Sequence, residues 1–185
     1  MISTILSVTY TMALAVTTVI AYTGINFKYE PEVFPVDMSS VEGSSIMHEI
    51  KYYKTDEKLK LSAKELKCLQ QNIYYEAGVE DYAGKIAVAQ VTLNRLKTKR
   101  WGNTICKVVY APHQFSWTKQ KKEKPKGKLW KESQQAAKDF INGVRIQSLN
   151  KSMFYHATWM ENEPSWAHHK IQVAEIGQHA FYKAK

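Results

Sequence analysis

The chain has 185 residues, a length that gives one domain a sizeable core, leaves room for an appendage and excludes two full domains. Its hydrophobic content of 44% and aromatic content of 12% are typical of a folded globular protein. The charge is uneven, because residues 1–60 contain 5 Lys and Arg against 7 Asp and Glu, whereas residues 61–185 contain 21 against 10. A surface this basic suits an anionic polymer, and nucleic acid, anionic lipid and bacterial cell wall all qualify on charge alone.

Residues 1–27 carry no charged side chain and are long enough to cross a bilayer as a helix. The run is rich in Thr, Ser and Ala, so its hydrophobicity per residue is modest. A cleaved signal peptide is the alternative, although the run lacks a basic start and a clear cleavage site. We predict a transmembrane or signal-anchor segment, with the following chain outside the inner membrane, because acidic residues flank the run: Glu30, Glu32, Asp37 and Glu42.

Residues 28–60 are predicted to be a linker. They contain Pro31, Pro35 and a patch of Ser and Gly, and they show no regular hydrophobic period. A short helix over residues 46–53 is an alternative for the last part of this segment.

The folded domain is predicted over residues 61–185, and it opens with a helix. Ser62 and Glu65 have the spacing of a capping box, and three apolar residues then share one helical face: Leu66, Leu69 and Ile73. Gly78 predicts the end of this helix.

Glu76 falls in the last turn of that helix, within the stretch QNIYYEAGVEDYAG. The negative end of the helix dipole disfavours a second negative charge there, and Tyr74 and Tyr75 limit hydration, so both effects raise the pKa of the carboxyl group. A carboxylic acid that keeps its proton near neutral pH can protonate a glycosidic oxygen. The spacing alone still favours the simpler interpretation, a surface glutamate at a helix end.

The remaining elements follow in order. Asp81 is the predicted cap of a second helix with apolar residues at helical spacing (Ile86, Ala89, Leu93 and Leu96), and Gly102 and Asn103 predict a turn. A short apolar element is expected over residues 105–110, and an extended segment after Pro112.

Residues 119–128, KQKKEKPKGK, form a lysine-rich run that is either a solvated loop or a contact with an anionic polymer. A third helix is expected over residues 129–141, with Gly143 after its end, and residues 151–159 and 171–183 have the composition of short strands. The sum is a mostly helical α+β domain with a small sheet.

Three separated stretches resemble one family: CLQQNIYYEAGVEDYAGKIAVAQVTLNRL, NTICKVVYAPHQFSW and FYHATWMENEPSWAHHKIQVAEIGQHAFY. They are similar to the catalytic domain of the SleB/CwlJ-type cell wall hydrolases, which include spore-cortex-lytic enzymes and bacterial and phage relatives. The resemblance covers residues 61–181 in the expected order. It departs from the family after the Glu76-Ala77 pair, where the usual Arg-Gly-Glu is replaced by Gly78-Val79-Glu80.

The resemblance implies a lysozyme-like, lytic transglycosylase-like fold and cleavage of the β-1,4 bond between N-acetylmuramic acid and N-acetylglucosamine. Glu76 is then the catalytic acid and base, and neither a second carboxyl group nor a cofactor is needed. A muramidase would normally use a pair of carboxyl groups, with Glu80 or Asp81 as the second member. We favour Glu80 as a structural or capping residue.

The resemblance also marks candidate substrate-binding residues: Tyr75, Glu80, Gln114, Phe115, Ser116, Trp117, Tyr155, His156 and Trp166. Ordinary packing is an open alternative for Phe115 and Trp166. Asn94 is expected to hold the helix or the cleft by side-chain hydrogen bonds. Cys68 and Cys106 are expected to form a disulfide, because an exported domain favours pairing and related sequences carry Cys at both places.

No metal site is expected, because the six His residues show no chelating spacing. The expected partners are peptidoglycan glycan strands and, through residues 1–27, the inner membrane; nucleic acid is not expected, and the protein should be a monomer. Two further hypotheses stay open. One is a membrane-tethered module that binds the cell wall without cutting it, and the other is a phage endolysin released from its signal anchor.

Overall fold

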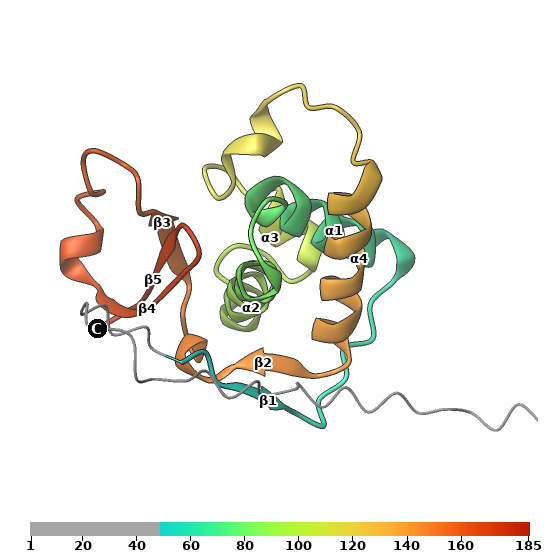
Figure 1. Ribbon diagram of the computed structural model, residues 1–185, viewed down its shortest axis with the longest axis horizontal. Helices are drawn as coiled ribbons and strands as arrows, with labels where there is room; N and C mark the ends of the chain where they lie inside the picture. The colour runs from blue at the N-terminus through green and yellow to red at the C-terminus, as the bar shows by residue number, and fades with distance from the viewer. Residues whose placement is uncertain (1–48) are drawn as a thin grey trace, which may run out of the picture. The chain divides into compact units, whose positions relative to one another are not determined.

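A computed structural model describes residues 49–185 of the chain (Figure 1). Helices occupy one side of this region and a three-stranded sheet the other, so the predicted α+β class is confirmed (Figure 1). The helices are α1 Ala63–Ala77, α2 Tyr82–Thr98, α3 Ile105–Val109 and α4 Gly127–Ile141, with 3-10 turns η2 Ser116–Lys119, η3 Gln147–Leu149 and η4 Ala167–His169. The strands are β1 Tyr52–Lys54, β2 Val144–Ile146, β3 Phe154–Ala157, β4 Ile171–Ile176 and β5 His179–Lys183.

The helices begin at the predicted caps. The Glu65 N–H donates to Ser62 Oγ at 3.3 Å before α1, and the Gly84 N–H donates to Asp81 Oδ1 at 2.9 Å before α2. α1 ends at Ala77 as predicted, but Gly78 has right-handed dihedral angles (φ −60°, ψ −35°) and not the left-handed ones typical of a terminating glycine.

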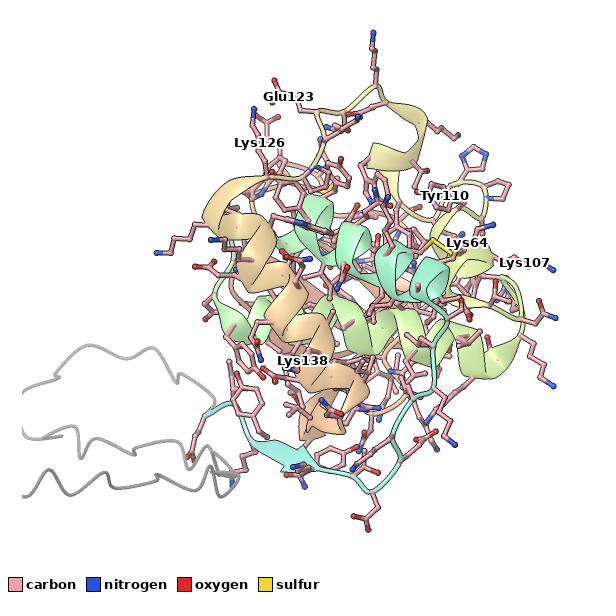
Figure 2. The ribbon with its side chains drawn as sticks, turned by 90° about the vertical axis from the view of Figure 1, so that its right-hand side faces the viewer. Lys64, Lys107, Tyr110, Glu123, Lys126 and Lys138 are labelled. Atoms are coloured by element: carbon pink, nitrogen blue, oxygen red, sulfur yellow. A yellow bond between two sulfur atoms is a disulfide. The ribbon has the colours of Figure 1, made fainter. Side chains whose placement is uncertain are left out.

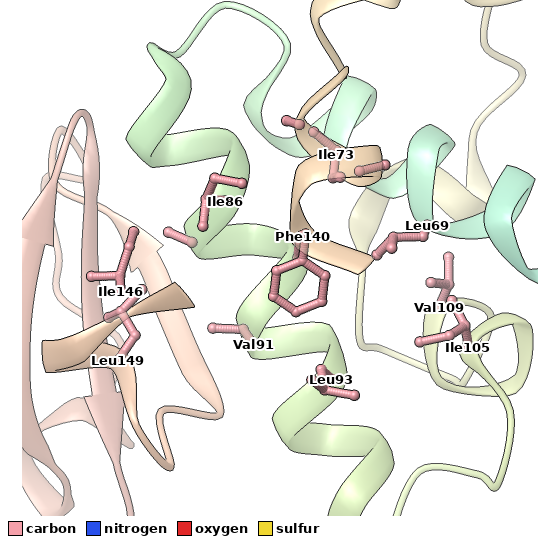
Figure 3. Close-up of a cluster of buried hydrophobic side chains, with 14 of the residues drawn as sticks. Leu69, Ile73, Ile86, Val91, Leu93, Ile105, Val109, Phe140, Ile146 and Leu149 are labelled. Atoms are coloured by element: carbon pink, nitrogen blue, oxygen red, sulfur yellow. The ribbon is translucent and has the colours of Figure 1, made fainter. Parts of the chain in front are cut away.

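The hydrophobic core fills the space between α1, α2, α3 and α4 (Figure 3). Leu69 and Ile73 are fully buried, as their helical spacing predicts, and Phe140 of α4 lies between them and α2. Each such side chain contributes about 1.5–3 kcal/mol to folding. Other members are Ile86, Val91, Leu93, Ile105, Val109, Ile146 and Leu149.

The predicted disulfide is confirmed, because Cys68 of α1 and Cys106 of α3 are bonded with their Cα atoms 5.3 Å apart. The two residues are 38 positions apart in the chain. Closing a loop of this length in the unfolded chain is worth about 4 kcal/mol in the chain-entropy description. The bond therefore holds α3 against α1.

The three-stranded sheet is antiparallel, in the order β3-β5-β4. Side chains alternate between its two faces. The inner face, towards the helical core, carries Tyr155 and Phe181, whereas the outer face carries Phe154, His156 and Tyr182. The outer face packs against Trp166 and the segment around it.

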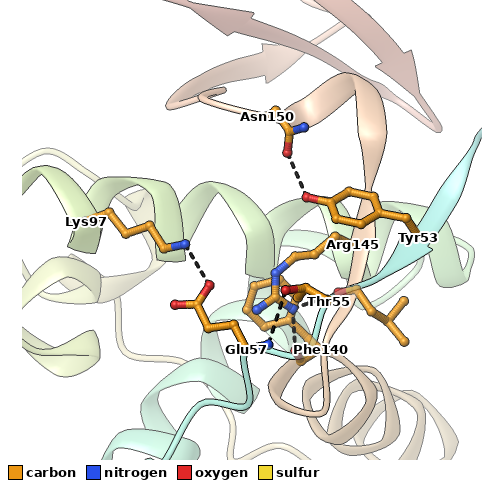
Figure 4. Close-up of polar contacts among 8 residues, drawn as sticks. Tyr53, Thr55, Glu57, Lys97, Phe140, Arg145 and Asn150 are labelled. Carbon is orange, nitrogen blue, oxygen red and sulfur yellow. Dashed lines mark hydrogen bonds and ion pairs between the residues drawn. The ribbon is translucent and has the colours of Figure 1, made fainter.

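A strand stands where the sequence predicted a linker or a short helix. Tyr52–Lys54 form β1 and pair antiparallel with β2, so this part of the predicted linker belongs to the folded domain. Figure 4 shows contacts of the strand and of the segment after it: the Tyr53 hydroxyl donates to Asn150 Oδ1 at 3.0 Å, and Lys97 pairs with Glu57 at 3.0 Å. The partner strand lies about ninety residues away in the sequence, and no local pattern indicates such a pairing.

The sequence predicted an extended segment after Pro112, and this prediction is wrong. The chain instead turns at His113 (φ +62°) and enters η2. The predicted membrane segment over residues 1–27, and residues 28–48 of the predicted linker, lie outside the described residues. Between residues 49 and 185, no helix combines the length and apolar character that crossing a membrane requires.

Candidate active site

Glu76 and Tyr155 meet where the end of α1 reaches the inner face of the sheet. The Tyr155 hydroxyl donates a hydrogen bond of 2.7 Å to Glu76 Oε2, across 79 positions of sequence. The Tyr155 ring is fixed by neighbours on β5, with its centroid 5.4 Å from Phe181 and 5.2 Å from His179. The fold thus joins two residues that the family resemblance marked separately.

The surroundings of Glu76 favour its protonated form. Burial raises the pKa of the carboxyl group, and this effect outweighs three that lower the pKa: the hydrogen bond from Tyr155 and the positive charges of Arg95 and Lys122. Burial also raises the pKa of the Tyr155 hydroxyl well above its usual value, so this hydroxyl stays a donor at neutral pH. The direction agrees with the sequence prediction for Glu76.

The two oxygens of Glu76 differ in what they can do. Oε2 accepts the hydrogen bond from Tyr155, whereas within residues 49–185 no protein group donates one to Oε1. A carboxylic acid whose Oε2 accepts this hydrogen bond can carry its proton on Oε1. Oε1 is therefore the atom from which a proton can pass to a bound substrate.

Arg95 is a charged neighbour of Glu76 that the sequence analysis missed. It lies on α2 and is almost completely buried, with Nε donating to the Met153 carbonyl at 2.8 Å and the guanidinium 4.9 Å from the centre of the Phe115 ring. Burial lowers the pKa of the Arg95 guanidinium from its usual value, and the charges of Tyr155 and Glu76 oppose this shift. A signal was present, since Arg95 stands between Leu93 and Leu96 on a helix whose face is otherwise apolar.

An aromatic group lies beside Glu76. The rings of Tyr75 and Trp117 are 4.4 Å apart, and Trp117 Nε1 donates to Asn72 Oδ1 at 3.1 Å. The Asn72 amide in turn donates to Thr92 Oγ1 at 3.1 Å, so a buried hydrogen-bond network fixes the indole. Tyr110 extends the group, with its ring 5.7 Å from Trp117.

The other residues of the Gln-Phe-Ser-Trp segment have different positions. Phe115 is buried in the core beneath Arg95, which is the packing alternative left open by the sequence. Gln114 bonds to the local Pro112 carbonyl at 3.3 Å, and Ser116 is exposed in η2. Of the segment, only Trp117 contacts the residue next to Glu76.

Glu80 is engaged in holding the turn between β4 and β5. Its Oε2 accepts from the Gln178 N–H at 3.2 Å, and its Oε1 lies 3.7 Å from His179 Nδ1, with the carboxylate side chain 7% exposed. Gly177 has φ +57°, and a Cβ added there would lie 1.8 Å from Glu80 Oε2. The glycine therefore admits the carboxylate into the turn.

His156 and Trp166 lie on the outer face of the sheet, and the structure does not bring them to Glu76. His156 Nε2 bonds to the Tyr182 hydroxyl at 2.9 Å, and the Trp166 ring packs 5.5 Å from Tyr182. The Tyr182 hydroxyl donates to Glu163 Oε1 at 2.8 Å. Asn94, which the sequence predicted to be structural, donates to the Leu149 and Ser152 carbonyls, and that prediction is confirmed.

A surface cavity of about 540 Å³ lies beside the disulfide and not beside Glu76. Figure 2 shows three of its lining residues, Lys64, Lys107 and Tyr110, around the sulfur atoms. Tyr110 belongs to this cavity and also contacts Trp117, so the aromatic group connects the cavity with the end of α1.

Comparison with known proteins links this arrangement to one family. The sequence model of the family described as Cell Wall Hydrolase matches residues 79–182, beginning three residues after Glu76. The spore cortex-lytic enzyme of Oceanobacillus iheyensis is 28% identical over 126 residues, which cover 66% of this chain and 42% of the relative. The spore cortex-lytic enzyme of Bacillus subtilis is 27% identical over 124 residues, 65% of this chain and 38% of the relative. The chain thus spans about two fifths of the length of these curated relatives.

Solved structures show the same fold. The catalytic domain of the Bacillus cereus SleB protein matches with a TM-score of 0.57 and 26% identity, covering 71% of this chain and 98% of that one. The catalytic domain of the germination-specific lytic transglycosylase SleB from Bacillus anthracis matches with a TM-score of 0.54 and 24% identity, covering 66% and 97%. The described region therefore has the fold of a SleB catalytic domain.

Proposed function

The chain belongs to the cell wall hydrolase family, and from that premise we propose that residues 61–185 cleave the β-1,4 bond between N-acetylmuramic acid and N-acetylglucosamine in peptidoglycan as a lytic transglycosylase. The observation that carries the proposal is the hydrogen bond from Tyr155 to Glu76 at the end of α1, where burial raises the pKa of the carboxyl group. Similar proteins are named as a spore cortex-lytic enzyme and as the catalytic domain of SleB, and these names support peptidoglycan as the substrate class.

The reaction needs one carboxyl group. Glu76 passes the proton on Oε1 to the O4 oxygen of N-acetylglucosamine as the bond from the muramoyl C1 to that oxygen breaks. The muramoyl C6 hydroxyl oxygen then bonds to C1, and its proton goes to the Glu76 carboxylate. The acid is regenerated, no water is consumed, and the product carries a 1,6-anhydro end.

The position of Glu80 favours this route over hydrolysis. A muramidase would need a second carboxylate to act as nucleophile or to activate water. The Glu80 carboxylate is almost fully enclosed and bonds to Gln178 of the β4–β5 turn. The charges that act on Glu76 in the described region come from two cations, Arg95 and Lys122.

Mass spectrometry of the released muropeptides tests the chemistry. Anhydro-muramoyl ends are expected from the wild type, and Glu76→Gln should release none while remaining folded. Detection of reducing ends in place of anhydro ends would contradict the transglycosylase mechanism and indicate a muramidase. Retained binding of peptidoglycan with no cleavage by either protein would instead support the binding module.

For the location of the enzyme we propose that residues 1–27 attach it to the inner membrane and that the folded domain works outside the cytoplasm. The Cys68–Cys106 disulfide supports this, because such bonds persist in oxidising compartments. An endolysin released from its signal anchor would leave the membrane fraction when the membrane potential collapses. Protein that stays membrane-bound before and after collapse would exclude the release mechanism.

A further inference from the structure

Residues 119–128, which we call the lysine loop, carry six Lys against one Glu. All six lysine side chains are exposed. The loop connects η2 with α4, so it begins two residues after Trp117. This concentration of positive charge favours the binding of an anionic ligand.

The loop is fixed next to the catalytic acid. The Tyr75 hydroxyl donates to the Glu123 carbonyl at 2.6 Å, and Tyr75 directly precedes Glu76 in α1. The positive charge of Lys122 also acts on the Glu76 carboxyl group and lowers its pKa.

Three of the lysines make no ion pair or hydrogen bond within the described residues. Lys119 contacts His113, Lys126 pairs with Glu123 and Lys128 pairs with Glu132. Across residues 49–185, no ion pair or hydrogen bond engages the remaining side chains, which are those of Lys121, Lys122 and Lys124. These three cations are free to bind an anionic ligand.

Their position does not serve the acid itself. The positive charge of Lys122 lowers the pKa of the Glu76 carboxyl group, whereas burial raises it. The advantage of cations at this place therefore lies in binding and not in proton transfer.

The substrate supplies the matching anions. The muramoyl sugar whose C1 is attacked carries, on its own O3, a lactyl group that bears the peptide stem, and the stem has several free carboxylates. A sugar placed with C1 at Glu76 must direct this stem over a neighbouring element, and the lysine loop has the complementary charge. We propose that Lys121, Lys122 and Lys124 bind the carboxylates of the peptide stem, so that the enzyme prefers peptide-bearing glycan to stripped glycan. This inference rests on the proposed function.

The test compares two variants on two substrates. The first variant changes Lys121, Lys122 and Lys124 to Gln. The matched control changes Lys64, Lys107 and Lys138 to Gln, which removes the same charge from places that Figure 2 shows away from Glu123 and Lys126. The substrates are glycan strands that bear peptide stems and the same strands after amidase removes the stems.

We expect the loop variant to lose about tenfold in kcat/KM on peptide-bearing strands, from three screened contacts of modest strength, and less than about twofold on stripped strands. The control should lose less than about twofold on both. Equal losses on both substrates, no loss at all, or equal losses in the control would each overturn the inference.

Binding measured in the Glu76→Gln background separates the two proposals. Peptide-dependent binding at low salt that disappears in the loop variant supports the inference even if the wild type cleaves nothing, a result that would overturn the proposed function alone. Retention by anionic phospholipid vesicles, lost in the loop variant without any discrimination between strands, would assign the loop to the membrane surface and overturn the inference.

Discussion

The two faces of the three-stranded sheet each present a tyrosine that donates a hydrogen bond to a glutamate. On the inner face Tyr155 bonds to Glu76 at 2.7 Å, and on the outer face Tyr182 bonds to Glu163 at 2.8 Å. The pKa shifts of the two carboxyl groups nevertheless have opposite directions. The pKa of Glu76 is raised by burial, whereas the pKa of Glu163 is lowered, chiefly by the hydrogen bond from Tyr182.

The comparison shows that a hydrogen bond from tyrosine does not by itself make an acid. Both tyrosines lower the pKa of their glutamate, and only on the inner face does burial under the end of α1 outweigh this effect. The difference therefore comes from the fold, because the inner face packs against the helical core, whereas the outer face packs against Trp166 and the segment around it.

The largest expected difference between the two pairs is in activity. Glu76→Gln should lower kcat/KM for peptidoglycan by about 10³-fold, because general acid catalysis is lost. Glu163→Gln should change it by less than about twofold, as for a surface substitution. Release of soluble muropeptides measures both, with circular dichroism as the control for folding. A comparable loss in Glu163→Gln would break the distinction between the faces.

Glu80 extends the comparison to a third carboxylate, whose role we expect to be structural. Glu80→Ala should destabilise the protein by about 2 kcal/mol, because the Gln178 N–H loses its acceptor. Activity per folded molecule should stay close to that of the wild type. Urea unfolding and the muropeptide assay check both quantities. Unchanged stability with an activity loss as large as that of Glu76→Gln would favour a two-carboxylate mechanism.

Substitution of the two tyrosines should have effects of intermediate size. Tyr155→Phe should lower kcat by about tenfold, since a hydrogen bond that orients the carboxyl group is removed. It should also move the alkaline limb of the pH–rate profile to higher pH, because that hydrogen bond lowers the pKa of Glu76. Tyr182→Phe is the control, and the alkaline limb of its pH–rate profile should coincide with that of the wild type. An alkaline limb that moves to lower pH in Tyr155→Phe would contradict the inference that the Tyr155 hydrogen bond lowers the pKa of Glu76.

The smallest expected effect is on the pH dependence of stability. The folded state raises the pKa of Glu76 above its ordinary value of 4.5, so its contribution to stability is complete below that value and is lost as pH rises through the raised pKa. Glutamine has no charge to bury, so Glu76→Gln does not lose stability as the pH rises. This variant should be more stable than the wild type at neutral pH by about 1 kcal/mol.

Glu163 has the opposite sign, since a lowered pKa stabilises the folded state above the ordinary value and the stabilisation is lost on acidification. Urea unfolding across a pH series should therefore separate Glu76→Gln from Glu163→Gln. A Glu76→Gln variant that is less stable than the wild type at neutral pH would show that burial is not the dominant effect on this carboxyl group.

The local parts of this fold could be predicted from the sequence. The cap at Ser62, the cap at Asp81 and the apolar face that includes Leu69 are set by residues a few positions apart, and each was confirmed. Glu76 was placed correctly in the last turn of α1 for the same reason. The Cys68–Cys106 pairing came from family resemblance and compartment, and it was confirmed too.

The parts that depend on distant contacts could not be predicted. Tyr155 and His156 are adjacent on one strand, and only the position of α1 decides which of them faces Glu76. β1 depends on a partner strand that no local pattern indicates. The burial of the Arg95 guanidinium depends on Phe115 and the Met153 carbonyl, which are distant in the sequence.

The hydrogen bond across 79 positions also has a consequence for synthesis of the chain. Glu76 leaves the ribosome long before Tyr155, and longer still before Gln178, which binds Glu80 across 98 positions. Until β3 emerges, the Glu76 carboxyl group lacks the hydrogen bond that Tyr155 donates in the folded domain. A chain shortened before Tyr155 therefore lacks the residue that orients Glu76, and the pair forms only when β3 has joined the domain.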